Sequence, residues 1–249
     1  MKVLVLFDGD GCVSKSLKKM GHEVMTSDIL DLPHIDYPVD ILKFDPLSFM
    51  MKGFIPDAIW ASPPCETWSI MTAVKGGGNM YWETIKNGYN RVIDITPRLD
   101  FSTDKRLSNP KRITERRIEH VNYLKRTVSI IQFFHKYNPR LTWIIENPQT
   151  GFMKFYIDKL IDGVIHNKTT YCMYGTRYKK ATNLFSNIEL NLKWCNTPSH
   201  HSDSFIRRWD HNQQPKETII PKSYLERSLV PTDLCIDVFN QLNVLPVLS

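Results

Sequence analysis

The sequence predicts an α/β fold in which helices cover both faces of a mainly parallel, doubly wound sheet. Continuous apolar runs, as expected for buried parallel strands, recur between residues 2 and 145. Turns that contain glycine or acidic residues directly follow several of these runs. Between two of the runs, a long segment carries apolar residues at helical spacing.

Strands and helices are expected to alternate from the N-terminus. The expected strands are residues 2–7, 23–26, a short extended piece at 39–42, 58–61 and 141–145. The expected helices are 13–20, which Gly21 ends, and an amphipathic helix at 114–137. Because such sheets bind ligands at the carboxyl ends of their strands, the residues that follow these strands form the candidate site.

The rest of the chain departs from this rhythm. Residues 76–110 hold three consecutive glycines and two prolines, so a long mobile loop or insert is expected there. A hairpin is expected at 168–185, around Gly175. The chain is expected to divide into a main domain at 1–187, a small loop-rich lobe at 188–232, and a closing helix with a tail at 233–249.

Composition indicates a protein that stays inside the cell. No apolar run approaches the length of about 20 residues that spans a bilayer, and the N-terminus has no signal-peptide anatomy. The five cysteines are scattered and odd in number, which argues against a disulfide framework. The formal charge of +6, dense at 105–125, fits a polyanionic partner, although charge alone equally fits a solvated surface.

A turn that fits a cofactor follows the first expected strand. It reads Phe7-Asp8-Gly9-Asp10-Gly11, and Asp28 ends the next strand, where an acidic residue binds ribose hydroxyls. A simple tight turn explains the same residues. The full GxGxxG pattern is missing because Ser14 follows Cys12-Val13, which disfavours NAD or FAD and leaves S-adenosylmethionine or a nucleotide.

Cys65 is the candidate nucleophile. It follows an expected strand in Ser62-Pro63-Pro64-Cys65, where the prolines stiffen the loop. A thiol attacks as the thiolate and therefore needs a polar or positive setting. Free cysteines are commonly buried as small hydrophobes, but the position at a strand end favours the nucleophile.

Two further groups carry candidate chemistry. Glu146 follows a very apolar strand, where a carboxyl group can act as a proton donor; capping of a helix is the alternative. The hairpin at 168–185 has a basic and aromatic turn that suits phosphate and base contacts, or carries solvated lysines. Cys195, His200 and His201 match no zinc spacing, so no metal is expected. His34, His120 and His135 are expected to be structural or exposed.

The order of these motifs resembles the cytosine-5 DNA methyltransferase family, in a short form like those of phage and viral genomes. Residues 7–11 resemble its FxGxG cofactor loop, and Pro63-Pro64-Cys65 resembles its Pro-Cys catalytic loop. Glu146-Asn147 resembles the start of its ENV motif, and residues 177–183 occupy the place of its QxRxR motif. The resemblance covers residues 2–187.

This resemblance implies a Rossmann-like S-adenosylmethionine-dependent methyltransferase fold with a small target-recognition lobe. The implied cofactor is S-adenosylmethionine, held by Phe7, Asp8, Gly9, Asp10, Gly11, Asp28, Ile29, Asp40, Ile41, Ser62 and Pro63. The implied substrate contacts are Pro64, Ser69, Asn147, Arg177, Lys179 and Lys180. The implied catalytic residues are Cys65 and Glu146.

The implied reaction puts a methyl group on carbon 5 of a cytosine in DNA. Cys65 would add to carbon 6, while Glu146 would contact the ring N3 and the exocyclic amine. In duplex DNA the cytosine would be flipped out, and the segment 66–110, with Trp68 nearby, would close over it. The implied protein is intracellular and favoured as a monomer. Its compartment is the cytoplasm of a bacterial host, or the nucleus or cytoplasm of a eukaryotic one.

Three departures from the family pattern keep alternatives open. Pro148 stands in the third position of ENV, Asn183 stands where a second arginine is usual, and no GN-type motif is recognisable near the C-terminus. Cytosine-5 methylation of RNA, as in the tRNA-methylating branch of the family, is one alternative. A non-catalytic nucleic-acid-binding homologue is the other.

Overall fold

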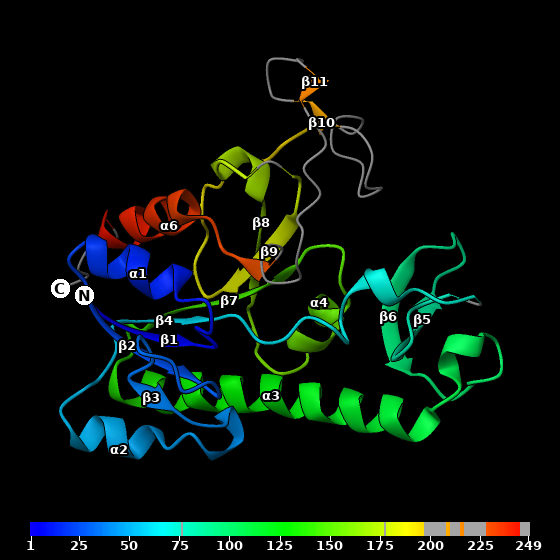
Figure 1. Cartoon of the computed structure of the whole chain (residues 1–249), viewed down its shortest axis with the longest axis horizontal. Helices are drawn as coiled ribbons and strands as arrows, with labels where there is room; N and C mark the ends of the chain where they lie inside the picture. The colour runs from blue at the N-terminus through cyan, green and yellow to red at the C-terminus, as the bar shows by residue number, and fades with distance from the viewer. Residues whose placement is uncertain (76, 177, 197–207, 210–214, 217–227, 245–249) are drawn as a thin grey trace.

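A computed structural model describes residues 1–75, 77–176, 178–196, 208–209, 215–216 and 228–244 (Figure 1). Its main sheet has seven strands in the order β3-β2-β1-β4-β7-β9-β8. The strands are β1 Lys2–Leu6, β2 Glu23–Asp28, β3 Tyr37–Pro38, β4 Ala58–Ala61, β7 Thr142–Pro148, β8 Ile165–Thr170 and β9 Ala181–Ser186. Neighbours from β3 to β7 pair in parallel, and β9 is antiparallel to β7 and β8. The predicted mainly parallel, doubly wound sheet is confirmed.

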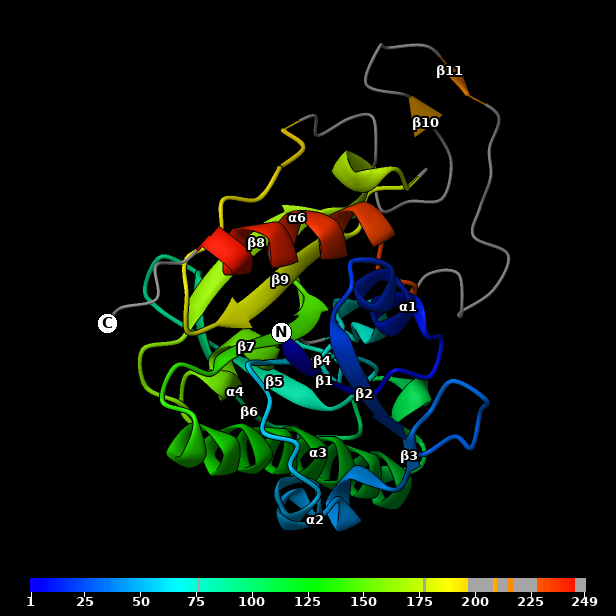
Figure 2. The same ribbon diagram turned by 90° about the vertical axis from the view of Figure 1, so that its left-hand side faces the viewer.

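Helices cover both faces of this sheet. The α-helices are α1 Cys12–Lys19, α2 Pro46–Met51, α3 Pro110–Tyr137, α4 Met153–Ile157 and α6 Thr232–Val244. The short 3-10 helices are η1 Ile41–Lys43, η2 Ile70–Thr72, η3 Lys105–Leu107 and η4 Tyr171–Tyr174. Figures 1 and 2 show α1 and α6 on one side of the sheet and α2 and α3 on the other. The helices predicted at 13–20 and 114–137, and the closing helix, are confirmed.

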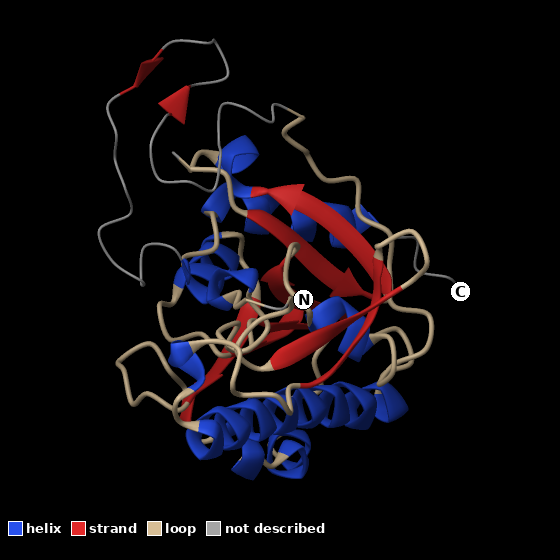
Figure 3. Cartoon of the chain, turned by 90° about the vertical axis from the view of Figure 1, so that its right-hand side faces the viewer, coloured by secondary structure: helices blue, strands red, loops and turns tan. Residues whose placement is uncertain are grey.

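Strand residues alternate between two apolar cores, one on each face of the sheet. Figure 3 shows the helices that lie on the two sides of the strands. On β1, Leu4 packs into the core beneath α3, whereas Val5 packs into the core beneath α1 and α6. Trp60 of β4 is fully buried and stacks on Phe239 of α6, with ring centroids 6.3 Å apart. Burial of both strand faces explains why these strands read as continuous apolar runs.

The extended piece predicted at 39–42 is wrong. The strand in this region, β3, lies earlier, and residues 41–43 form η1 instead. The backbone N–H of Leu42 donates to Oδ1 of Asp40 at 3.0 Å. An aspartate that accepts a bond from the second following N–H favours a turn over a strand, and this local bond decides the conformation.

The irregular loop predicted at 76–110 is instead largely folded. It contains an antiparallel hairpin of β5 Trp82–Lys86 and β6 Val92–Pro97. Trp82 and Ile95 are buried, whereas most neighbouring side chains are polar, so the apolar pattern is too sparse to predict strands. The hairpin predicted at 168–185 is confirmed as β8 and β9, with Gly175 in the left-handed conformation at a φ of 86°.

The lobe predicted at 188–232 lies mostly outside the described residues. Its first residues belong to the main core, because Leu190 is buried with α6 residues. Two short strands, β10 Arg208–Trp209 and β11 Pro215–Lys216, pair in antiparallel fashion. Within the described ranges, no helix combines the length and the apolar character needed to cross a membrane.

We predict that Phe239→Ala lowers the free energy of unfolding by about 3–5 kcal/mol, because it leaves a cavity beside Trp60. Phe239 is fully buried, whereas Ile236 on the same helix is 36% exposed. Urea denaturation measures the free energy of unfolding of both variants, and Ile236→Ala should lower it much less than Phe239→Ala does. Equal effects of the two substitutions would contradict the packing of α6 on the sheet.

Candidate active site

The carboxyl ends of four strands meet at one edge of the sheet. In the β1–β4 pair Leu6 lies opposite Ala61, and in the β4–β7 pair Ala61 lies opposite Ile145. Leu6 also lies opposite Ser27 of β2. The segments that follow these strands carry the turn at 7–11, Asp28, the Cys65 loop and Glu146, so the structure brings together residues that are distant in sequence.

The turn after β1 is tightly held. The N–H of Phe7 donates to the Ser27 carbonyl at 2.9 Å, and the N–H of Gly11 donates to the Asp8 carbonyl at 2.8 Å. Phe7 has a φ of 62°, an unfavourable region for a bulky residue. Gly11 has a φ of 68°, and a Cβ there would lie 2.8 Å from the ring of His34. Glycine is therefore required at position 11, and His34 belongs to this turn.

Asp8 is the buried acid of the turn. It is 2% exposed, and its Oδ1 accepts a bond of 3.4 Å from the Ser14 N–H. Its Oδ2 and the hydroxyl of Ser27 have no hydrogen-bond partner in the described part of the chain. Burial raises the pKa of Asp8 to about 6. Unsatisfied buried acceptors are costly, and they fit a ligand that brings hydrogen-bond donors.

Asp28 and Asp40 lie next to this turn. Asp28 Oδ2 would be 3.2 Å from a Cβ at Gly9, so only glycine leaves this carboxylate its place. The Val39 N–H donates to the Asp28 carbonyl at 2.7 Å, which brings Asp40 alongside. Of the apolar residues expected here, Ile41 is buried and Ile29 is 66% exposed.

The Cys65 loop is braced on both sides. The N–H groups of Trp68 and Ser69 donate to the Cys65 carbonyl at 3.1 and 2.9 Å, which turns the chain back after the cysteine. Asn147 Nδ2 donates to the Pro63 carbonyl at 3.2 Å. Cys65 is half-buried and takes part in no disulfide. The bond between Asn147 and Pro63 ties the loop that carries Cys65 to the strand that carries Glu146.

Ser62 and Ser69 hold the two ends of this loop. The indole N–H of Trp60 donates to Ser62 Oγ at 3.0 Å, and the N–H of Ser62 donates to the Leu6 carbonyl at 3.2 Å. Ser69 Oγ accepts a bond of 3.1 Å from the Met71 N–H and begins η2. Both serines therefore have structural partners in the loop.

Glu146 lies within β7 rather than after it, because β9 pairs with β7 as far as Pro148. Its side chain is buried, and its Oε1 accepts bonds from the Tyr171 hydroxyl at 2.8 Å and from Lys180 Nζ at 3.3 Å. Burial raises the pKa of Tyr171 well above its ordinary value, and Glu146 raises it further, so the hydroxyl remains a donor. Both contacts use Oε1, so neither of them holds Oε2.

Lys180 is the charge partner of this glutamate. Its ammonium lies 4.6 Å from the Tyr171 ring centroid, and only 17% of its side chain is exposed. The sequence predicts it as a substrate contact, and the structure places it on the carboxylate. Lys179 lies over the Trp194 ring at 5.7 Å, and Arg177 lies outside the described residues. No local pattern predicts Tyr171 as a partner, because the pairing of β8, β9 and β7 brings it to Glu146.

Asn147 and Asn183 form a buried amide pair. They lie opposite each other in the β7–β9 register and are almost completely buried. The Oδ1 atoms of both have no hydrogen-bond partner within the described ranges. Asn183 stands where the family pattern expects an arginine. Two unsatisfied amide oxygens next to the Cys65 loop fit a ligand that brings N–H donors.

Glu66 anchors the Cys65 loop to α3, which the sequence did not predict. Its carboxylate accepts a bond of 3.0 Å from Arg116 and one of 3.1 Å from the Tyr81 hydroxyl. Burial alone would raise the pKa of Glu66, but these hydrogen bonds outweigh burial and lower it. The residue after the cysteine therefore stays ionised and fixed.

The residues considered for a metal lie only partly in the described part of the chain. Cys195 is buried, whereas His200 and His201 lie outside the described residues. Across the ranges that the structure describes, no three potential metal ligands come together. His120, which is expected to be structural or exposed, is 1% exposed on α3, and burial lowers its pKa.

Comparison with known proteins finds one viral protein that is similar to this chain along most of its length. No protein-family model matches the chain. Over 222 residues the chain is 29% identical to a protein of Frog virus 3 (isolate Goorha) named probable DNA (cytosine-5)-methyltransferase. The alignment covers 85% of this chain and 84% of the viral protein. The resemblance to the cytosine-5 methyltransferase family is confirmed.

Two solved structures are also similar to this chain. One is a triple mutant of Spodoptera frugiperda DNMT2, with 16% identity, a TM-score of 0.41, and coverage of 79% of this chain and 53% of that one. The other is the S. pombe Dnmt2 methyltransferase, with 13% identity, a TM-score of 0.42, and coverage of 77% and 51%. The chain therefore spans about half the length of these two structures.

We predict that Asp8→Asn removes a pH-dependent part of stability. A carboxyl group whose pKa is about 6 when folded and 3.8 when unfolded stabilises the fold below pH 4. This contribution disappears as the pH rises through 6, and it amounts to about 3 kcal/mol. Urea denaturation from pH 4 to 7 should show a steeper loss for the wild type than for Asp8→Asn. Parallel curves would contradict the burial of Asp8.

Proposed function

We propose that the protein transfers a methyl group from S-adenosylmethionine to carbon 5 of cytosine in DNA, with Cys65 as a covalent nucleophile. The observation that carries this proposal is the link between the Cys65 loop and β7. The bond from Asn147 to the Pro63 carbonyl, 3.2 Å long, ties the loop that carries Cys65 to the strand that carries the buried Glu146. A nucleophile and an acid at one sheet edge suit addition to a ring and protonation of it.

The residues next to the Cys65 loop fit S-adenosylmethionine. The unsatisfied Oδ2 of Asp8 suits a group with N–H donors, and Asp28 and Asp40 supply carboxylates for ribose hydroxyls and an adenine amine. The close approach of Asp28 to Gly9 and of His34 to Gly11 packs these side chains against the turn. When bound, this cofactor supplies an electrophilic methyl group on a sulfonium.

Cys65 solves the main chemical difficulty, which is the low nucleophilicity of carbon 5. Addition of its thiolate to carbon 6 forms the Sγ–C6 bond and moves the electron pair of the C5–C6 double bond to carbon 5. Carbon 5 is then an enamine carbon that takes the methyl group. Transfer of the carbon 5 proton to a base or to water leaves its electron pair to re-form the C5–C6 double bond. The Sγ–C6 bond breaks at the same time, which releases 5-methylcytosine and the Cys65 thiolate.

Glu146 binds and polarises the base. Its Oε1 is held by Tyr171 and Lys180, so the carboxyl group has a fixed orientation toward a ring N3 and an exocyclic amine. A proton placed on N3 stabilises the adduct that Cys65 forms. The unsatisfied amide oxygens of Asn147 and Asn183 accept bonds from a cytosine amine. Without the base, water would have to donate to these oxygens. A base reaches such a buried position in a duplex only when it is flipped out.

DNA is the proposed substrate because the viral relative, aligned over most of both chains, is named a probable DNA (cytosine-5)-methyltransferase. The basic character of the chain, with a formal charge of +6, fits a polyanion.

We predict that Cys65→Ala abolishes covalent trapping on DNA that contains 5-fluorocytosine. This base retains its carbon 5 substituent, so the adduct with Cys65 accumulates and is seen as a shifted band on a denaturing gel. Cys12→Ala is the matched control, because burial and the neighbouring Asp10 raise the pKa of this half-buried thiol to about 12. Cys12→Ala should still form the adduct.

The same protein tests the reaction with methyl-labelled S-adenosylmethionine and mixed-sequence DNA, followed by digestion to nucleosides. Label in 5-methylcytosine that Cys65→Ala loses supports the proposal. Transfer to transfer RNA but not to DNA would replace DNA as the substrate. Failure to label either nucleic acid would overturn the proposal.

We predict that Glu146→Gln lowers kcat by about 10²–10⁴-fold, because the amide cannot donate a proton to N3 in the same way. Binding of S-adenosylmethionine, measured by calorimetry, should stay within twofold, since the residue acts on the base. A variant with unchanged kcat would remove Glu146 from the mechanism.

A further inference from the structure

We propose that the tip of the β5–β6 hairpin, residues 86–91, contacts the DNA that flanks the target cytosine. In this arrangement Tyr89 lies against a base or sugar, and Lys86 and Arg91 lie on phosphates. The inference rests on the proposed function, since it assigns a second contact to the same substrate. The structural basis of the inference is that the β5–β6 hairpin forms a rigid extension of the Cys65 loop.

The base of the hairpin is bonded directly to the Cys65 loop. Asn79 is fully buried, and its Nδ2 donates to the carbonyls of Thr67 and Ser69, both at 3.0 Å. Its Oδ1 accepts from the N–H groups of Tyr81 and Trp82, both at 2.8 Å. One side chain therefore links the residues that follow Cys65 to the first residues of the hairpin.

Aromatic packing reinforces this link. The rings of Trp68 and Trp82 stack with centroids 5.1 Å apart, and Tyr156 packs against both at 5.5 and 5.9 Å. Stacked pairs of this kind add about 0.5–1.5 kcal/mol beyond the area that they bury. Trp68 lies three residues after Cys65, so the hairpin and the loop form one packed unit.

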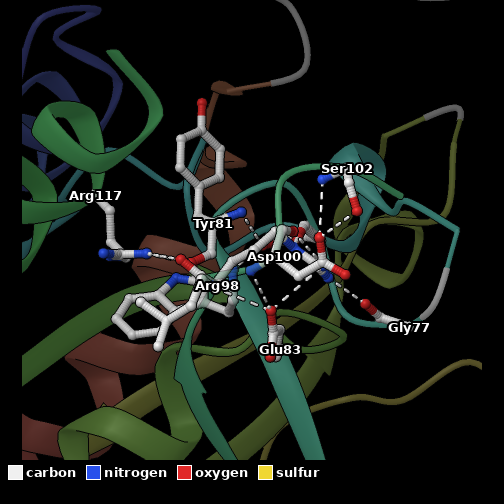
Figure 4. A network of polar contacts seen from close by, with 10 residues as sticks. Gly77, Tyr81, Glu83, Arg98, Asp100, Ser102 and Arg117 are labelled. Carbon is white, nitrogen blue, oxygen red and sulfur yellow. Dashed lines mark hydrogen bonds and ion pairs between the residues drawn. The ribbon is translucent and has the colours of Figure 1, made fainter. Parts of the chain in front are cut away.

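A buried polar network makes the hairpin rigid (Figure 4). Arg98 is 2% exposed and donates to the carbonyls of Asn79, Gly77 and Asp100. Glu83 pairs with Arg98 at 3.6 Å and accepts bonds from the N–H groups of Leu99 and Asp100. A buried arginine is expensive unless its donors are satisfied, so this network fixes the surrounding chain.

The hairpin is also fixed to the helices. Arg117 of α3 is 8% exposed and donates to the carbonyls of Tyr81 and Arg98 at 3.1 and 3.2 Å. Near the other end, Asp94 of β6 pairs with Lys159 at 2.7 Å. These contacts fix the orientation of the hairpin relative to the Cys65 loop. The hairpin lies past the carboxyl end of β4, on the side to which the chain continues through the Cys65 loop (Figure 1).

The tip presents an exposed aromatic ring between two positive charges. Asn87 Oδ1 accepts from the N–H groups of Tyr89 and Arg91 at 3.1 and 3.0 Å, which orders the turn. Tyr89 is 93% exposed, more than any other large apolar side chain in the described part of the chain. Lys86 and Arg91 are exposed and are the charged residues of the segment 84–93. An ordered turn thus holds a tyrosine in water beside two cations.

This combination fits nucleic acid better than a protein or a lipid surface. Aromatic side chains stack on bases of any sequence, and nearby cations bind the backbone. A two-stranded β-ribbon also fits the major groove of a duplex. The strands extend the tip by about 15 Å from Trp82, at about 3.3 Å per residue.

DNA binding tests the proposal, measured by fluorescence anisotropy with a labelled mixed-sequence duplex at several salt concentrations. Tyr89→Ala should weaken binding about fivefold or more. The double variant Lys86→Ala/Arg91→Ala should lower the slope of log Kd against log salt by about 1.8, because two phosphate contacts are lost. A merely structural role would not change this slope.

Matched controls lie at the opposite edge of the sheet. Met51 is 80% exposed, and Lys19 and Lys52 are exposed and precede β2 and β4. Met51→Ala and Lys19→Ala/Lys52→Ala should bind DNA as the wild type does. Thermal melting confirms that each variant is folded, since the altered side chains are exposed.

The outcomes separate this inference from the proposed function. If the wild type methylates DNA and the tip variants bind like it in both Kd and salt slope, the hairpin contact is wrong and the function stands. If the tip variants weaken DNA binding but the wild type transfers no methyl group, the contact stands and the function fails. A wild type that binds no DNA, or losses that occur only with transfer RNA as the probe, would overturn the assignment of DNA to the tip.

Discussion

The parallel register of β1, β4 and β7 is the constraint on which the whole site depends. Leu6, Ala61 and Ile145 lie side by side, so the segments that leave these strands must start at one edge. Hydrogen bonds from Ser62 to Leu6 and from Asn147 to Pro63 continue this alignment past the strand ends. Residues separated by more than half of the chain therefore meet at this edge because the strand register aligns the ends of the strands.

Around this edge, stability and ligand binding impose opposite demands. Asp8, Ser27, Asn147 and Asn183 each bury an oxygen that has no partner in the described part of the chain. Each such atom costs about 1–3 kcal/mol if nothing satisfies it. The two cores of the sheet offset this cost, and a bound ligand with donors would recover it. Sites that are poorly satisfied on a well-packed scaffold are typical of binding edges.

The hairpin next to the Cys65 loop shows the opposite design. Asn79 makes hydrogen bonds through both ends of its amide, and Arg98 donates to the carbonyls of Gly77, Asn79 and Asp100. Polar groups replace a large apolar core in this small unit, because a two-stranded hairpin alone is marginal in water. The Trp68–Trp82 stack passes this rigidity to the residues after Cys65. Loop, hairpin and α3 therefore act as one body beside the site.

The amino-acid sequence predicts the central parallel strands, the long helix and the candidate residues at the strand ends. Apolar runs such as residues 2–6 and 58–61 are buried on both faces, so they carry a clear signal, and Cys65 stands out by its prolines. The partners of these residues follow from the folded chain instead. Tyr171 and Lys180 reach Glu146 through the pairing of β9 with β7, and the hairpin at 82–97 depends on the burial of Arg98 and Asn79. Such contacts join segments far apart in the chain, and local patterns of hydrophobicity carry no information about which polar groups will meet.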